Sequence, residues 1–81
     1  MTDKKLTLTD MKSNQSGRVR EIHGGPGLAN RLDAMGIRPG KKITKLSSMM
    51  MRGPVTVQVD NAQLAIGFGM ARKIIVEIDQ L

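Results

Sequence analysis

The sequence predicts a mostly β protein, a small barrel of five to six short strands with one inserted short α-helix. Several short runs alternate apolar and polar residues, as strands with one buried face do, and turn residues separate these runs. Only one stretch repeats apolar residues at helical spacing. Two of the runs break their alternation, which predicts β-bulges that bend strands around a barrel.

The amino-terminal part predicts two strands joined by a turn. A short first strand is expected at 6–8, and a cluster of turn residues follows at 13–17. The second strand is expected at 18–23. Val19 and Ile22 differ in parity within it, so one face of the strand cannot hold both without a bulge.

The only expected helix extends from about Pro26 to Met35. Leu28, Leu32 and Met35 recur at i, i+4 and i+7, which is the apolar stripe of a short amphipathic helix. Gly25 is the expected cap, and Pro26 suits the first helical position because its φ is already fixed there.

The end of this helix is defined by glycine and proline chemistry. Gly36 stands where a left-handed backbone costs glycine little, so we expect a positive φ there. Ile37 then falls where a Schellman ending packs it back against Leu32. Pro39-Gly40 supplies the fixed φ and the positive φ of a type II turn.

The remaining strands complete the barrel. A strand over 41–49 has a parity break between Ile43 and Leu46, which predicts a second bulge. Further strands are expected at 55–59, 63–66 and 74–78, and a turn or single helical turn at 67–71. Such a barrel would be SH3-like, with a ubiquitin-like or OB arrangement as the structural alternative.

Composition indicates one small domain, 1–81, with an aliphatic core. The chain has 81 residues, 40% of them hydrophobic, with a single aromatic residue and no cysteine. Disulfides and thiolate metal sites are therefore excluded. We expect no signal peptide and no membrane insertion, hence a cytoplasmic protein, because no apolar run approaches the ~18 residues needed to span a bilayer.

Basic residues dominate the middle of the chain. The net charge is +6, and no acidic residue lies between Asp33 and Asp60. This distribution favours an acidic partner. We expect Lys41 and Lys45 to share one face of their strand, with Lys42 on the other. Consecutive methionines at a hairpin tip could add an adaptable contact. The candidate partner-binding residues are Arg31, Arg38, Lys41, Lys45, Met49, Met50, Met51 and Arg52.

No metal, cofactor or catalytic site is predicted. His23 is the only histidine, and the carboxylates lack the spacing that would bring them together on a metal. Three consecutive methionines on a strand point to alternating faces, so they cannot converge on a soft metal. No nucleophile stands beside a plausible base, so we predict that the protein is not an enzyme.

The chain resembles the FeoA family of bacterial ferrous-iron transport proteins over about 6–78. Met35-Gly36-Ile37-Arg38-Pro39-Gly40, after a helix carrying Arg31-Leu32, is the distinctive part of the resemblance. The chain departs from the family pattern at 65–70, where its segment is less polar than the corresponding segment of family members. Three further segments agree in order: Gly17-Arg18-Val19, Gly53-Pro54-Val55 and Ala71-Arg72-Lys73-Ile74.

The resemblance implies a function. FeoA proteins are SH3-like, non-enzymatic and cytoplasmic, and such a protein would dock on the FeoB permease, which carries a guanine-nucleotide-binding domain. The resemblance also implies an association with transition-metal ions, for which these residues predict no site. The alternatives are a basic SH3-like nucleic-acid module and a detached SH3-like domain of an iron-dependent repressor. Because the chain has a single aromatic residue, the need to stack bases argues against the nucleic-acid alternative. We expect a monomer or weak homodimer.

Overall fold

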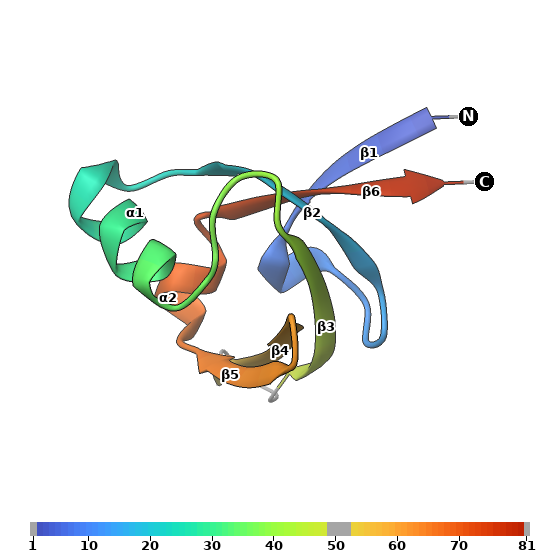
Figure 1. Ribbon diagram of the computed structural model, residues 1–81. Helices are drawn as coiled ribbons and strands as arrows, with labels where there is room; N and C mark the ends of the chain where they lie inside the picture. The colour runs from blue at the N-terminus through green and yellow to red at the C-terminus, as the bar shows by residue number, and fades with distance from the viewer. Residues whose placement is uncertain (1, 49–52, 81) are drawn as a thin grey trace.

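One antiparallel sheet of six strands curls into an SH3-like barrel in this computed structural model, which describes residues 2–48 and 53–80. The strand order is β1-β6-β2-β3-β4-β5. Figure 1 shows both helices at one end of the barrel and both termini at the other. The elements are β1 (Thr2–Thr7), a 3-10 turn (Leu8–Asp10), β2 (Ser16–Ile22), α1 (Gly25–Ala34), β3 (Lys42–Ser48), β4 (Val55–Val59), β5 (Ala62–Ile66), α2 (Phe68–Ala71) and β6 (Ile74–Gln80).

Both predicted bulges are present. The pairing of β2 with β6 shifts register between Val19 and Glu21. The pairing of β3 with β4 shifts between Lys45 and Ser47. Each shift lies within the segment whose alternation breaks, because an extra residue is what allows a strand to serve two faces of a curved sheet.

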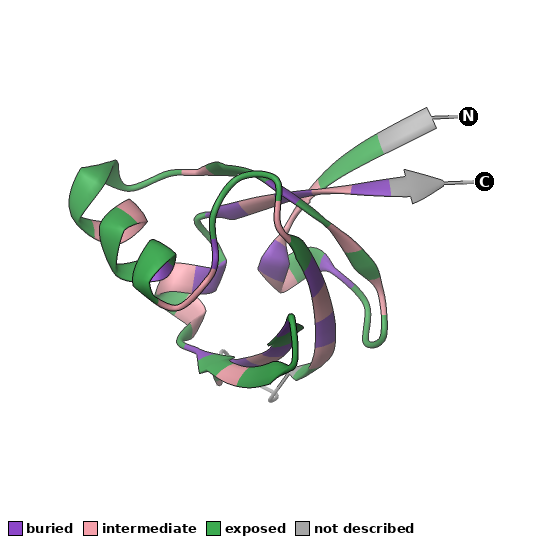
Figure 2. Cartoon of the chain, viewed as in Figure 1, coloured by how far each residue is buried: buried purple, intermediate pink, exposed green. Residues whose placement is uncertain are grey.

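Aliphatic side chains from every strand face the interior of the barrel. In β4 the alternation of buried valines with outward polar residues is as predicted. Figure 2 shows buried positions alternating with half-buried ones along β3. The buried hydrophobic residues are Leu8, Met11, Val19, Leu32, Ile37, Ile43, Val55, Val57, Val59, Ile66, Ala71, Ile74, Val76 and Ile78.

The junction between α1 and β3 has the predicted backbone geometry. The Gly36 amide donates to the Asp33 carbonyl and the Ile37 amide donates to the Leu32 carbonyl, both at 2.9 Å. These two bonds form a Schellman ending, and Gly36 has a φ of 88°. Leu32 and Ile37 are both fully buried in the core. The helix ending is therefore fixed by bonds between near neighbours.

The turn after this helix is also confirmed. Gly40 has a φ of 94°, and the Lys41 amide donates to the Arg38 carbonyl at 3.1 Å. The Gly40 amide in turn donates to the Val19 carbonyl at 2.7 Å. The turn is therefore held against β2, and it sets where β3 begins.

The start of α1 differs from the prediction by one residue. The cap is Gly24, with a φ of 115°, and Gly25 follows it at 86°. Two successive positive φ values turn the chain sharply out of β2, which only glycine does at little cost. Leu28 and Met35 are half-buried, because α1 lies at the end of the barrel and only Leu32 reaches its centre.

The first strand also differs from the prediction. It covers Thr2–Thr7, and Leu8 leaves it to begin the 3-10 turn, where its side chain is fully buried. The next strand begins at Ser16, inside the expected turn cluster, and Asn14 takes the left-handed conformation with a φ of 70°. Local alternation could not show either boundary, because both depend on pairing with β6 and β3.

Candidate partner-binding surface

Lys45 was predicted to lie on the partner-binding surface, and the structure shows that it is buried. Only 2% of its surface is exposed. Its Nζ donates to the Thr9 carbonyl at 3.0 Å and to the Met11 carbonyl at 2.6 Å. Lys45 is two residues from buried Ile43 in an alternating strand, so the two share the inner face. The spacing of Lys45 from apolar Ile43 was the signal that could have placed its side chain on the inner face of the strand, and the sequence interpretation did not use it.

The backbone of Lys45 is bound to the same loop. Its amide donates to the Gln15 carbonyl at 2.9 Å, and its carbonyl accepts from the Asn14 amide at 2.6 Å. Burial lowers the pKa of the Lys45 ammonium, and nearby Asp10 opposes this shift. Lys45 therefore holds the 3-10 turn and the loop after it against β3.

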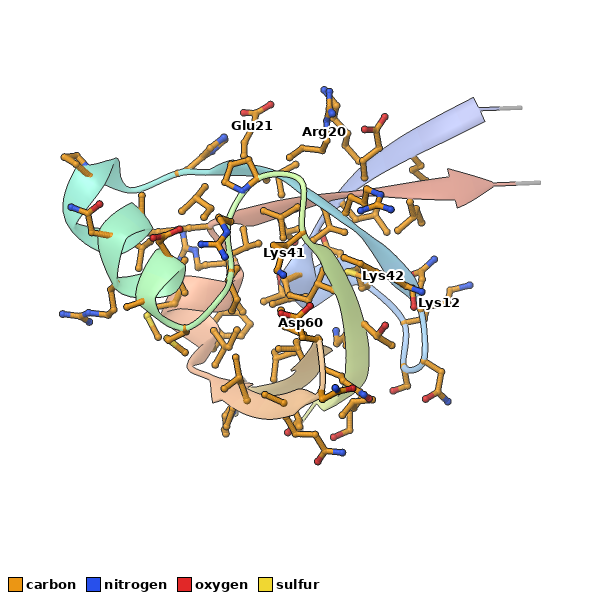
Figure 3. All side chains as sticks on the ribbon, viewed as in Figure 1. Lys12, Arg20, Glu21, Lys41, Lys42 and Asp60 are labelled. Atoms are coloured by element: carbon orange, nitrogen blue, oxygen red, sulfur yellow. The ribbon has the colours of Figure 1, made fainter. Side chains whose placement is uncertain are left out.

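Lys41 remains partly accessible but already has a partner. It precedes β3, its side chain is 29% exposed, and its Nζ lies 3.0 and 2.8 Å from the two carboxylate oxygens of Asp60. Figure 3 shows the two side chains pointing toward each other between the start of β3 and the β4–β5 hairpin. This ion pair ties together segments that are 19 residues apart.

Two other predicted basic residues are exposed. Arg31 lies on α1. Arg38 lies in the following turn, where its Nη1 is 3.0 Å from Asp33 Oδ1. The remaining predicted contacts, Met49, Met50, Met51 and Arg52, lie outside the described residues.

A polar groove of about 270 Å³ lies on the outer face of β3 and β4. Thr44 on β3 pairs with Gln58 on β4, and the residues two positions along each strand share that face. Their inward neighbours are buried, which leaves these positions directed to solvent. The sequence interpretation did not assign this groove. Its lining residues are Lys42, Thr44, Gln58 and Asp60.

The adjacent strand extends the polar surface beside the groove. Ser16 pairs with Thr44, and their hydroxyl oxygens are 2.7 Å apart. Arg18 pairs with Lys42, and its Nη1 donates to the Gly40 carbonyl at 3.0 Å. A row of charged residues therefore reaches the groove from β2.

This charged row crosses four strands. Glu77 on β6 lies opposite Arg18 on one side and Lys5 on the other. The Nε of Arg20 is 2.9 Å from Glu77 Oε1. A carboxylate thus lies among cations on the outer face, where single ion pairs contribute about 0–1 kcal/mol.

The only histidine lies on the surface beside β2. Its Nε2 is 2.9 Å from Glu21 Oε1, and the hydrogen bond from His23 lowers the pKa of the Glu21 carboxyl. No group of three His, Cys, Asp or Glu side chains gathers into a metal-binding arrangement within residues 2–48 and 53–80. Over the same part of the chain, no helix has the length and apolarity to cross a lipid bilayer.

The comparisons with known proteins agree with one another on family. The FeoA domain matches residues 6–78 of this chain. The chain belongs to the FeoA family. The "Putative Fe(2+) transport protein A" of Methanocaldococcus jannaschii is 36% identical over 70 residues, which cover 86% of this chain and 83% of the relative. The helix ending and the turn on which the resemblance depends are both present in the structure.

Solved structures show the same fold. An iron uptake regulatory protein (FeoA) aligns with a TM-score of 0.83 and 33% identity, covering 93% of this chain and 99% of that one. A Stenotrophomonas maltophilia FeoA complexed with zinc, described as a prokaryotic SH3 domain protein, gives 0.73 and 23%, covering 88% of both chains. A manganese-dependent transcriptional repressor gives 0.86 and 21%, covering 98% of this chain and 44% of its own.

Proposed function

We propose that the protein is a non-enzymatic accessory of ferrous-iron uptake that docks on the cytoplasmic side of a FeoB-type permease. The observation that carries the proposal is membership of the FeoA family across nearly the whole chain, with a relative named for Fe(2+) transport that is matched over 83% of its length. The likeness to the repressor concerns the fold alone and less than half of that protein. An accessory role is therefore preferred to a repressor domain.

The chemistry of the surface supports a binding role. Exposed cations on α1, on the following turn and on β3 accompany a net charge of +6. The one histidine is paired with Glu21 on the surface, and the sequence holds no cysteine. Electrostatic attraction of an acidic partner speeds the formation of such complexes.

Uptake of radiolabelled Fe(II) tests the transport role. The protein is expressed in a bacterial strain whose own FeoA-family gene is deleted. The same strain carries the FeoB-type permease from the organism that encodes this protein. Restored uptake relative to the empty vector is the expected result. Unchanged uptake, with the folded protein present at normal abundance, contradicts the proposal.

Co-purification tests the docking. The detergent-solubilised permease is tagged and isolated with and without the protein, at low salt and again at high salt. We expect association that weakens as salt rises, because screening reduces attraction between exposed charges. Absence of the protein from the isolated permease at low salt contradicts docking.

A further inference from the structure

We infer that the polar groove between β3 and β4 binds an acidic segment of a partner protein, with a carboxylate of that segment on Lys42. The identity of the partner rests on the proposed function, whereas the chemistry of the groove does not. The groove volume of about 270 Å³ is well above the ~10–15 Å³ that a cavity needs to hold one water. A side-chain carboxylate with bridging water therefore fits.

The groove offers hydrogen-bond donors that the protein itself does not use. The side chains of Lys42 and Gln58 make no hydrogen bond or ion pair within the described residues. Both are exposed, and they come from neighbouring strands of a rigid sheet. Donors placed in advance on a rigid surface lose little conformational freedom when a carboxylate binds.

The charge around the groove is positive and fixed in position. Arg18 is held by its bond to the Gly40 carbonyl, and Lys41 is held by Asp60. Within the described residues, these two cations and Lys42 lie around the groove together with one carboxylate, Asp60. The Lys41 ion pair compensates Asp60, so Arg18 and Lys42 remain as the cations that attract an acidic group.

The pattern of charges favours a protein over a membrane or a nucleic acid. Glu77 and Asp60 are fixed among the cations of the row, so the row alternates in sign and does not offer the uniformly positive surface that matches the phosphates of lipid headgroups or of a nucleic acid. None of the described residues that line the groove is aromatic, so they offer bases no stacking surface. A protein segment can place single carboxylates between neutral residues, and such spacing fits a fixed mixed pattern.

Titration with a synthetic peptide of alternating glutamate and serine, followed by NMR of the amide groups, tests the groove directly. We expect the largest shifts at Lys42, Thr44 and Gln58. Lys42→Glu should weaken binding about tenfold, because attraction becomes repulsion. Asp60→Asn should tighten binding, since it removes a carboxylate and frees Lys41. Asparagine also tolerates the positive φ of 56° found at this position.

A matched control is Lys73→Glu, which changes the net charge equally but at an exposed lysine beside Gly24, at the start of α1. Its effect on peptide binding should be less than about twofold at physiological salt, because the Debye length is about 8 Å there. Equal weakening by Lys42→Glu and Lys73→Glu overturns the inference, since binding would then follow net charge alone. Shifts centred away from β3 and β4 overturn it too.

Further binding measurements distinguish a protein partner from other partners, and they distinguish failure of the groove inference from failure of the proposed function. Anionic phospholipid vesicles and a single-stranded oligonucleotide should bind more weakly than the peptide at equal charge; tighter binding of either overturns the choice of a protein partner. If the permease retains wild-type protein and Lys42→Glu equally, the groove inference fails while docking stands. If the permease retains neither although the peptide binds the groove, docking fails and the groove remains an acidic-segment site.

Discussion

The two faces of β3 use the same residue type for opposite purposes. Lys45 faces inward, and its ammonium is bound to two backbone carbonyls of a distant loop. Lys42, three residues earlier, faces outward beside Thr44 in a polar groove and has no partner within the described residues. Both residues contribute equally to the net charge of +6. Charge counted along a sequence therefore overstates the charge available to a partner, because strand parity removes part of it from the surface.

Substitution of Lys45 should change the free energy of unfolding more than any other substitution discussed below. Lys45→Glu places a carboxylate against the carbonyls of Thr9 and Met11, so we expect loss of cooperative folding. Lys45→Met keeps the apolar stem but leaves those carbonyls unpaired, at a cost of about 1–3 kcal/mol for each. Circular dichroism during urea unfolding measures both. Lys42→Glu is the matched control and should unfold like the wild type; equal destabilisation would remove the contrast between the two faces.

Gly17 extends the comparison to the inner face of β2. A Cβ there would lie 2.5 Å from the Glu77 carbonyl oxygen and 2.6 Å from Val76 Cγ1. Gly17→Ala should therefore cost about 1–3 kcal/mol, because the backbone of β6 cannot yield easily. Gly27→Ala is the control, since nothing lies within 4 Å of a Cβ at that helical position. A melting temperature that falls in both variants would contradict crowding as the cause.

Gly36 provides a comparison outside the sheet, where the constraint is conformational. Its φ is 88°, and the nearest atom to a Cβ there would be Val59 Cγ1 at 3.9 Å, so there is room for a side chain. Gly36→Val should still cost about 1–2 kcal/mol, because a β-branched residue is strained in the left-handed region. Gly36→Asn should cost less, since asparagine tolerates that conformation. Thermal unfolding of the two variants measures both losses of stability. Equal losses would argue against backbone strain as the cause.

The pH dependence of stability sharpens the contrast between the two lysines. Burial lowers the pKa of Lys45 below its ordinary 10.5. Between the lowered pKa and 10.5 the unfolded chain binds more protons than the native state, so the contribution of Lys45 to stability rises with pH across that window. Urea unfolding from neutral pH upward should show this rise in wild type relative to Lys45→Met. An identical pH dependence in the two proteins would contradict it.

The smallest expected change in stability comes from the pair of Glu21 and His23 on the surface at the end of β2. His23 lowers the pKa of Glu21 below its ordinary 4.5. His23→Ala should raise the Glu21 pKa back toward that value, as seen by NMR titration of its carboxyl carbon. Any stability due to this pair is present above the ordinary pKa and is lost as pH falls through the lowered one. Because both groups are exposed, unfolding should hardly change, and a large loss of stability would be unexpected.

Most of the fold could be predicted from local patterns. Alternation located β4 and β6, the turn at 60–61 located β5, and the parity breaks located both bulges. The candidate surface was predicted less well. Lys41 and Lys45 were expected to share an exposed face, but one is partly covered by Asp60 and the other is buried. Asp60 and Thr44 were not assigned to a site, because the groove exists only where β3 pairs with β4.

Local residue chemistry is enough to specify the junction from α1 to β3. Its Schellman ending and its turn need only the conformational freedom of Gly36 and Gly40 and hydrogen bonds between near neighbours. Which cations reach solvent depends instead on contacts between distant parts of the chain. The partners of Lys45 are carbonyls 34 and 36 residues away, brought to it by the curvature of the sheet. Those carbonyls compensate part of the cost of burying a charge, and no local pattern encodes where they lie.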